Sequence, residues 1–235
     1  MPSVKSADLL WSYSIEDGGT VTEPPAVADG VVVFVAEGYP NRYVYALDAS
    51  TGDPRWRYQH DGGVRASPAT ANGVVYLGDE STFYALDGSS GGLSPDVLWH
   101  YQLERYVVSP PAVAGSVVYV QDEDGYFNAI NATTGDLIWR QEIGQVSERS
   151  SPVVLDGVVY VSTSMGLYAL DASTGDQLWR NDRSSGKRGF AVAAGFVFVG
   201  AGEYLQALNI STGELRWRYE TDTSGNVGPP NVANG

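Results

Sequence analysis

The chain of 235 residues contains no cysteine, which excludes disulfide bonds, Cys-based metal sites and thiol nucleophiles. Lysine is nearly absent too, because only Lys5 and Lys187 stand beside twelve arginines. No run of about 18 apolar residues is present that could cross a bilayer. The N-terminal stretch also lacks the apolar core of a signal peptide. We therefore expect neither a membrane span nor an export signal within this chain.

Positive charge is scarce as a whole, since 28 acidic residues face 14 basic ones and the net charge is −14. A nucleic-acid-binding protein needs a basic face, so this function class is excluded. An acidic, lysine-poor composition is typical of proteins from high-salt organisms, where screening makes self-repulsion tolerable. The alternative is an ordinary acidic protein.

The tryptophans occur at regular intervals. Successive ones are separated by 45, 43, 40, 40 and 38 residues. A period of about 41 residues indicates a solenoid, a propeller or an array of repeats. The six positions are Trp11, Trp56, Trp99, Trp139, Trp179 and Trp217.

Each period has the pattern of short β-strands. The fourth repeat runs "SPVVLDG", "VVYVSTSMG", "LYALDASTG" and "DQLWRND" over residues 151–182. These segments are rich in Val, Tyr and Leu and are separated by Gly, Asp, Ser and Asn, while helical periodicity is not sustained. Four strands of five or six residues with short turns fill roughly 40 residues. The repeat therefore predicts a four-stranded antiparallel sheet, the unit of a β-propeller blade.

One phrase recurs where the third strand meets the fourth. It reads "ALDASTGDPRWR" at 46–57 and "ALDASTGDQLWR" at 169–180, with looser copies from 85, 129 and 207. The Asp can hold the turn and the Gly can take positive φ. The Trp on the outer strand can then cover the matching turn of the next blade, where its N–H needs a partner. The expected docking residues are the six tryptophans with Gly52, Gly91, Gly135, Gly175 and Gly213.

The spacing Ala-x-Asp-x-x-Thr-Gly-x-x-x-Trp resembles the tryptophan-docking motif of the pyrroloquinoline-quinone-like propeller repeats. Two copies fit in full, Asn131 and Asn209 replace Asp in two others, and repeat two has four extra residues between Gly91 and Trp99. A WD-type propeller is disfavoured because no Trp is followed by Asp. The resemblance implies an all-β propeller of four-stranded antiparallel blades.

The repeats assign residues 1–235 to a single propeller domain. Five blades are complete, and the pieces at 1–21 and 222–235 correspond only to an outer and an inner strand. These two pieces lack the middle strands of a blade, so they cannot complete one together. We therefore expect an incomplete arc of a seven- or eight-bladed propeller, the alternative being a five-bladed ring with two spare strands. The expected blades are approximately 22–63, 64–104, 105–145, 146–184 and 185–221.

Enzymes of this repeat family are quinone-dependent dehydrogenases that hold the quinone with calcium, often against a Cys–Cys disulfide. This chain has no cysteine, and no separate set of Asp, Glu and Asn can be assigned to calcium. We expect no catalytic residue, cofactor or metal here. His60 and His100 are expected at the surface or at an edge. The turn "DEDG" at 122–125 could bind a hard cation, but it lacks EF-hand spacing and is expected to be solvated.

Basic residues gather where the chain leads into the inner strands. Each expected inner strand begins with a proline, or with Phe190 in repeat five. The residues three positions before this point are Thr22, Arg65, Val108, Arg149, Lys187 and Val227. Cations at one mouth of a channel create a local positive potential. This predicts a site for a carboxylate, a phosphate or an acidic peptide, unless Arg65 and Arg149 merely pair with nearby acids such as Glu148 or stay hydrated. The candidate residues are Arg65, Arg149, Lys187, Arg188 and Arg105.

The function expected is that of a non-catalytic scaffold or binding module for a protein or glycan partner. The repeat is similar to that of propellers in envelope protein assembly, which bind partner segments through loops at one face. This resemblance favours an extracytoplasmic or cell-envelope location. Tyr106, Val107 and Val108 are candidates for an exposed contact patch. Two alternatives stay open, a fragment of a quinoprotein dehydrogenase with its site residues outside this chain, and a sensor or accessory domain of a larger surface protein or kinase.

Overall fold

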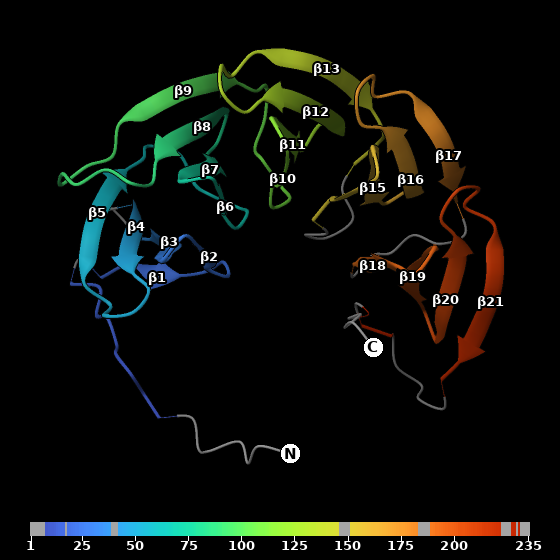
Figure 1. The fold of residues 1–235 in the computed structure, drawn as a ribbon, viewed down its shortest axis with the longest axis horizontal. Coiled ribbons are helices and arrows are strands. Elements are labelled where there is room, and N and C mark those ends of the chain that lie inside the picture. Colours follow the sequence, from blue (N-terminus) through green and yellow to red (C-terminus); the bar gives the residue numbers. More distant parts are fainter. Residues whose placement is uncertain are drawn as a thin grey trace.

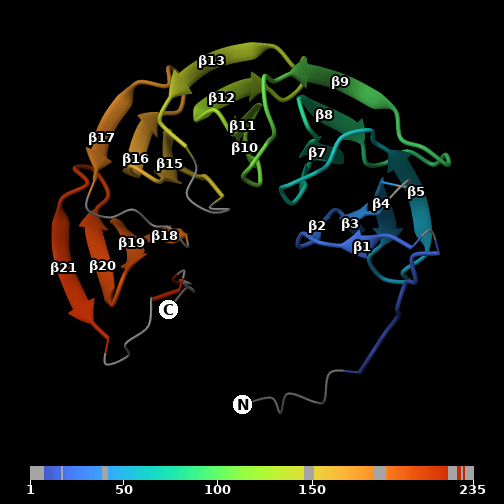
Figure 2. The same ribbon diagram turned by 180° about the vertical axis from the view of Figure 1, so that it is seen from behind.

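A computed structural model describes residues 8–16, 18–38, 42–145, 151–182, 189–221, 227–228 and 230. Every regular element in these ranges is a β-strand, which confirms the all-β expectation. The described part has no helix long and apolar enough to cross a membrane. Five antiparallel sheets lie side by side and form an open arc (Figures 1 and 2), as the repeat pattern predicts.

The sheets follow one another along the chain and are called blades 1 to 5. Blade 1 comprises β1 (Thr20–Val21), β2 (Ala26–Ala28), β3 (Val31–Glu37), β4 (Tyr43–Asp48) and β5 (Pro54–Gln59). Blade 2 comprises β6 (Ala69–Ala71), β7 (Val74–Gly78), β8 (Thr82–Asp87) and β9 (Val97–Gln102). Blade 3 comprises β10 (Ala112–Ala114), β11 (Val117–Gln121), β12 (Tyr126–Asn131) and β13 (Leu137–Glu142). Blade 4 comprises β14 (Val153–Leu155), β15 (Val158–Thr163), β16 (Gly166–Asp171) and β17 (Gln177–Asn181), and blade 5 comprises β18 (Phe190–Ala193), β19 (Phe196–Ala201), β20 (Tyr204–Asn209) and β21 (Leu215–Glu220).

In each blade the strands run from the inside of the arc to its circumference in chain order (Figure 1). The innermost strand is short, and in blade 1 both β1 and β2 pair with β3. Because consecutive strands are antiparallel neighbours, their connections alternate between the two rims of the arc. One rim carries the segments that lead into the inner strands and the hairpins between second and third strands. We call it the mouth rim, and the other rim carries the inner hairpins and the docking turns.

A β-bulge recurs at the same point of every blade. In blade 1, Ala46 pairs with Trp56 but Leu47 pairs with Pro54, so Arg55 has no opposite residue. A bulge increases the local twist of a strand and re-aims its side chains. The bulge therefore sets the direction of each outer-strand tryptophan. The extra residues are Arg55, Leu98, Ile138, Leu178 and Arg216.

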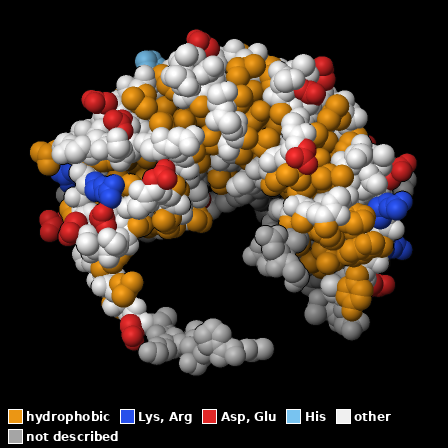
Figure 3. Space-filling model, viewed as in Figure 1, with side chains coloured by type: hydrophobic (Ala, Val, Ile, Leu, Met, Phe, Trp, Pro, Cys, Tyr) orange, Lys and Arg blue, Asp and Glu red, His pale blue; other side chains and the backbone are white. Residues whose placement is uncertain are grey.

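The core lies between blades as well as within them. Val33 and Val35 of blade 1, for example, pack in one buried cluster with Leu77 of blade 2. The far face of blade 5 has no such neighbour in the described structure, so Trp217 is 43% exposed and Tyr219 is 61% exposed. Apolar side chains accordingly gather over this end of the arc (Figure 3). Each blade is thus stabilised mainly by its nearest neighbours.

Candidate functional site

Five of the six tryptophans reach the docking turn of the blade that follows them, whereas Trp217 of blade 5 is 43% exposed and makes no such contact in the described structure. The indole N–H of Trp99 donates to the carbonyl of Ala132 at 2.9 Å, and that of Trp139 donates to Ala172 at 3.0 Å. Each acceptor directly follows the Asp or Asn of the next docking turn. The other joints have the same form, with Trp11 to Ala49, Trp56 to Gly88 and Trp179 to Ile210 at 3.1, 3.1 and 2.9 Å.

The docking glycines are required by both backbone and space. Gly135 has φ +77°, and a Cβ there would lie 2.9 Å from the Trp99 ring. Gly175 has φ +79°, and its Cβ would lie 2.7 Å from Trp139. Gly52 and Gly213 meet Trp11 and Trp179 in the same way. Any side chain at these four positions would therefore push the indole off the turn.

Asp and Asn perform one task in the docking turn. Oδ1 of Asp171 accepts hydrogen bonds from the backbone N–H of Ser173 and Thr174 at 2.8 and 3.0 Å. Oδ1 of Asn131 accepts the equivalent two bonds at 2.9 and 3.1 Å. Hydrogen bonds from Ser173, first from its hydroxyl and then from its backbone, lower the pKa of Asp171. The turn needs an oxygen acceptor, which explains why Asn131 and Asn209 can replace Asp.

Blade 2 departs from the expected joint. Nothing lies within 4 Å of a Cβ built on Gly91, and its φ is not in the left-handed region. The four extra residues form a loop that reaches back to blade 1, where the Arg57 N–H donates to the carbonyl of Leu93 at 3.2 Å. Trp56 is accordingly 2% exposed, against 8% for Trp99. Gly91 therefore does not receive an indole in the way expected for it.

The mouth rim between blades 2 and 3 holds a cluster of Arg65, Tyr106, Glu80 and Glu123, which we call the mouth cluster. The Arg65 guanidinium lies 3.5 Å from the centre of the Tyr106 ring and 3.2 Å from Oε1 of Glu123. The Tyr106 hydroxyl donates to Oε1 of Glu80 at 2.8 Å. Two lead-in segments and two hairpins are thus tied together across the blade boundary.

The predicted anion site is only partly within the described residues. Arg65 and Arg105 are described, and each lies beside a carboxylate, since Nε of Arg105 is 3.7 Å from Oδ1 of Asp124. Arg149, Lys187 and Arg188 lie outside the described residues, as does Glu148. The partner of Arg65 is Glu123 of the neighbouring blade rather than an acid near it in sequence. Anion binding at this mouth stays a prediction.

The patch expected at residues 106–108 is not an exposed apolar surface. Val107 is fully buried, because it forms a β-bridge with Asp122 and packs where Gly78 of blade 2 has no side chain. Tyr106 is half-buried beneath Arg65. The lead-in segment is therefore a wedge between two blades, and this part of the prediction is wrong.

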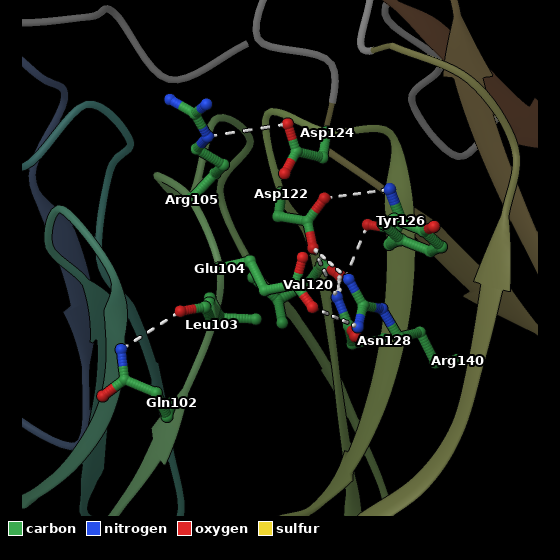
Figure 4. A network of polar contacts seen from close by, with 10 residues as sticks. All are labelled: Gln102, Leu103, Glu104, Arg105, Val120, Asp122, Asp124, Tyr126, Asn128 and Arg140. Carbon is green, nitrogen blue, oxygen red and sulfur yellow. Dashed lines mark hydrogen bonds and ion pairs between the residues drawn. The ribbon is translucent and has the colours of Figure 1, made fainter.

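The acidic turn at 122–125 is built into the structure (Figure 4). The fully buried Asp122 carboxylate accepts from the Tyr126 N–H at 2.9 Å and lies 3.7 Å from Arg140. Burial raises the pKa of Asp122. The expectation of a solvated turn is thus wrong for Asp122, since the segment 106–108 covers it. Among the described residues, no group of three or more metal-ligating side chains occurs.

The two histidines lie in different surroundings. His60 is 4% exposed and its Nδ1 lies 2.6 Å from the Gly62 carbonyl, so the expected surface position is wrong. Its Nε2 lies 3.9 Å from a Glu37 oxygen. The loop leading into blade 2 folds over this ring, which neither composition nor spacing indicates. His100 is exposed as expected.

One recurrent contact escaped the sequence analysis. In four blades the arginine that follows the docking tryptophan lies over a tyrosine of the third strand. The signal was present as a repeated Trp-Arg pair with a Tyr at or near the start of the preceding strand. The pairs are Arg57 with Tyr43, Arg140 with Tyr126, Arg180 with Tyr168 and Arg218 with Tyr204, with 3.7 to 5.1 Å between guanidinium carbon and ring centre.

Solved structures share this fold. BamB from Moraxella catarrhalis matches with a TM-score of 0.74 and 24% identity, covering 89% of this chain and 64% of that one. The computationally designed Ika8 protein matches with a TM-score of 0.76 and 16% identity, covering 91% and 65%. A europium-containing methanol dehydrogenase matches with a TM-score of 0.74 and 16% identity, covering 91% and 53%. The chain thus spans less than two thirds of the length of each, and identities this low show the fold alone.

A search of the curated proteins finds no significant match. A family profile described as "Outer membrane protein assembly factor BamB" matches residues 3–94, 78–189 and 166–235. These ranges together span nearly the whole chain and contain all six tryptophans. The chain therefore belongs to this BamB family of pyrroloquinoline-quinone-like β-propellers.

Proposed function

We propose that this propeller is a non-catalytic binding module whose mouth rim contacts a protein partner. The observation that carries the proposal is the mouth cluster, in which an Arg–Tyr stack is held at the surface by carboxylates from both neighbouring blades. Arg and Tyr are the side chains that most often anchor protein interfaces, together with Trp. The Arg65 side chain is half exposed, so a partner can reach it.

Preorganisation favours this surface over a flexible one. Ordering a long side chain at an interface costs about 0.5–1.5 kcal/mol, and the Arg65 side chain is already ordered by ring and carboxylate. A carboxylate from the partner can replace Glu123 beside Arg65, which would give the expected anion-binding role a protein ligand. Family membership supports the same conclusion, since the family description names an assembly factor.

A dehydrogenase function has less support. The solved dehydrogenases share the fold at 16–18% identity, which carries no residue assignment. Asp122, in the turn that could bind a hard cation, accepts a backbone hydrogen bond that holds this turn. Fold does not imply function, and a site has to be argued from its own groups.

The experiment is site-specific photo-crosslinking in the cells that make the protein. A photoreactive amino acid at Asp124, in the hairpin of the mouth rim, should give a discrete crosslinked partner. The same amino acid at the exposed Asp53, in the docking turn of blade 1 on the other rim, is the control and should give none. Adding Arg65→Glu to the Asp124 probe should lower the crosslinked fraction at least fivefold.

Two results would count against the proposal. Equal crosslinking from both rims would remove the mouth rim as the contact surface. Oxidation of alcohols by the purified chain after addition of pyrroloquinoline quinone and calcium, followed with an artificial electron acceptor, would show that the chain is itself catalytic.

A further inference from the structure

The boundary between blades 4 and 5 differs from the others at two positions. The last residue of the innermost strand is Leu155 in blade 4 and Ala in the other four blades, at Ala28, Ala71, Ala114 and Ala193. The carbonyl acceptor of the docking indole belongs to Ile210 in blade 5 and to Ala or Gly elsewhere, at Ala49, Gly88, Ala132 and Ala172. Both differences place a larger apolar side chain at the boundary between blades 4 and 5.

These two side chains line the same cavity. It has a volume of about 330 Å³ and lies on the rim opposite the mouth, between the β14–β15 hairpin, the start of β17 and the docking turn of blade 5. Leu155, Leu178 and Ile210 form apolar walls, and the rings of Tyr160 and Trp179 close it. Small-molecule sites typically have volumes from about 300 to 1,000 Å³ and combine such walls with a few polar groups.

The Tyr160 hydroxyl supplies one polar group. The corresponding tyrosines, Tyr76 and Tyr119, donate to the carbonyls of Ala132 and Ala172 at 3.4 and 3.0 Å. Within the described ranges Tyr160 makes no equivalent bond, although the Ile210 carbonyl accepts from Trp179 just as those of Ala132 and Ala172 accept from their tryptophans. Tyr160 is only 3% exposed, and the exposed part includes its hydroxyl, which lies at the cavity with no protein partner among the described residues. A hydroxyl that is open to the cavity can bond to a ligand there.

The negative charge of the cavity rim and of the whole chain favours a positively charged ligand. Asp156 lines the cavity from the turn of the β14–β15 hairpin and is exposed to solvent. Asp156 and Tyr160 both line the cavity, and burial and then the negative charge of Asp156 raise the pKa of Tyr160. The net charge of −14 repels an anion and attracts a cation.

We propose that this cavity binds an alkylammonium group, with its carbon chain against Leu155 and Leu178 and its ammonium between the Tyr160 hydroxyl and the Asp156 carboxylate. The source is a lysine side chain of a polypeptide partner, a commitment that rests on the proposed binding function. An ammonium is a hydrogen-bond donor only and would use both oxygens. An alkyl chain with a charged tip matches a pocket that is apolar inside and acidic at its rim.

The test follows the indole N–H resonance of Trp179 by NMR, assigned from its loss in Trp179→Phe, while n-butylammonium is added to the full chain. We expect a saturable shift and at least fivefold weaker binding of n-butanol, which has the same chain without charge. A peptide with one central lysine and blocked ends should shift the same resonance. Binding of the free amine without binding of the peptide would overturn the lysine source.

Two variants reproduce residues that other blades already carry. Asp156→Asn corresponds to Asn72 and Tyr160→Phe corresponds to Phe198, so both are expected to keep the fold, and retained dispersion of the indole resonances checks this. We expect the dissociation constant for n-butylammonium to rise roughly fivefold and tenfold respectively. The matched controls, Asp29→Asn and Tyr119→Phe at other boundaries, should leave it unchanged.

The proposal is overturned if n-butylammonium gives no saturable shift, if n-butanol binds equally well, or if Asp156→Asn has no effect. None of these results bears on the mouth rim, because the photo-crosslinking experiment reports that surface separately. The cavity and the mouth rim can therefore fail independently.

Discussion

At the scale of single residues, the repeated phrase describes a joint rather than a reaction centre. Its Asp or Asn holds the turn, its Gly admits the ring, and its Trp crosses to the next blade. The indole supplies both a large apolar area and a donor that has to be satisfied. Backbone ladders end at the edge of each sheet, so these rings provide the connection that the ladders do not.

Truncation of a docking ring should destabilise according to its place in the arc. Trp139→Ala and Trp179→Ala leave cavities at internal joints, and we expect each to lower the free energy of unfolding by about 3–5 kcal/mol. Trp11→Ala should cost less, because Trp11 is half-buried and its segment belongs to no sheet of the described structure. Urea unfolding followed by circular dichroism measures the difference, and equal losses at the three positions would contradict the joint.

Protonation of the docking turn should weaken the fold in acid. The folded-state pKa of Asp171 is lowered, so its contribution to stability is present above the unfolded value of about 3.9 and is lost as the pH falls through the folded value. Asp171→Asn keeps the acceptor, as Asn131 shows, and should remove this part of the acid sensitivity. Unfolding free energies of both proteins between pH 7 and pH 2 provide the test. If the unfolding free energies of the two proteins fall in parallel as the pH is lowered, ionisation of Asp171 does not stabilise the turn.

Residues of the joint could be predicted from the sequence because each acts within one repeat phrase. Asp122 and His60 could not, because their burial is decided by lead-in segments that fold over them from outside their own hairpins. Arg65 illustrates the same limit, since its partner Glu123 is 58 residues away in the chain. Pairing across a blade boundary depends on geometry that a single repeat does not contain.

At the scale of elements, Gly, Asp and Asn mark nearly every turn, and strand positions were therefore predictable. Four of the five inner hairpins use two residues with positive φ, such as Asn72 at 53° followed by Gly73 at 74°. Such type I′ turns match the twist of the strands and favour Asn-Gly or Asp-Gly. The bulge and the path of the loop after Gly91 were not predicted, because both depend on the neighbouring strand or blade.

Blade 5 carries an unfavourable residue in this turn. Ala194 has φ +51°, a conformation that costs an L-residue with a Cβ roughly 1–2 kcal/mol. Ala194→Asn should therefore raise the free energy of unfolding by about 0.5–1 kcal/mol, because Asn tolerates this region. Thermal unfolding measures the gain, and Gly195→Ala at φ +79° is the opposite control, which should destabilise. A loss with Ala194→Asn would mean that the turn is held by contacts other than its backbone conformation.

The extra loop of blade 2 can be removed cleanly. Deleting residues 92–95 joins Gly91 to Asp96 and recreates Gly-Asp-Val-Leu-Trp, which parallels the Gly-Asp-Leu-Ile-Trp of blade 3. We expect the fold to persist with a loss of about 1 kcal/mol, since one hydrogen bond between blades disappears. Hydrogen exchange at the Arg57 amide should accelerate, while exchange at Arg140 serves as the control. Unchanged protection of Arg57 would show that the loop does not hold blade 1.

At the scale of the whole molecule, stability is a sum of blades and their boundaries. Every described boundary combines an indole bridge with a buried apolar cluster, so no closing contact is needed for neighbouring blades to support each other. The open arc could be predicted from the strand content of the terminal pieces. The cavity between blades 4 and 5 could not, because it arises where two exceptional residues from different blades meet.

Net charge acts on the molecule as a whole. With 28 acidic and 14 basic residues, self-repulsion opposes the compact state, and the exposed ion pairs of the mouth rim offset little of it. Sodium chloride shortens the screening length from about 30 Å at 0.01 M to about 10 Å at 0.1 M and about 3 Å at 1 M. We expect the urea midpoint to rise with salt, and potassium chloride to act equally if screening is the cause. A rise that continues above about 1 M would favour a protein adapted to high salt, whereas a plateau near 0.2 M would favour an ordinary acidic protein. A midpoint that falls on adding salt would mean that the ion pairs outweigh the repulsion, and the inference from composition would be wrong.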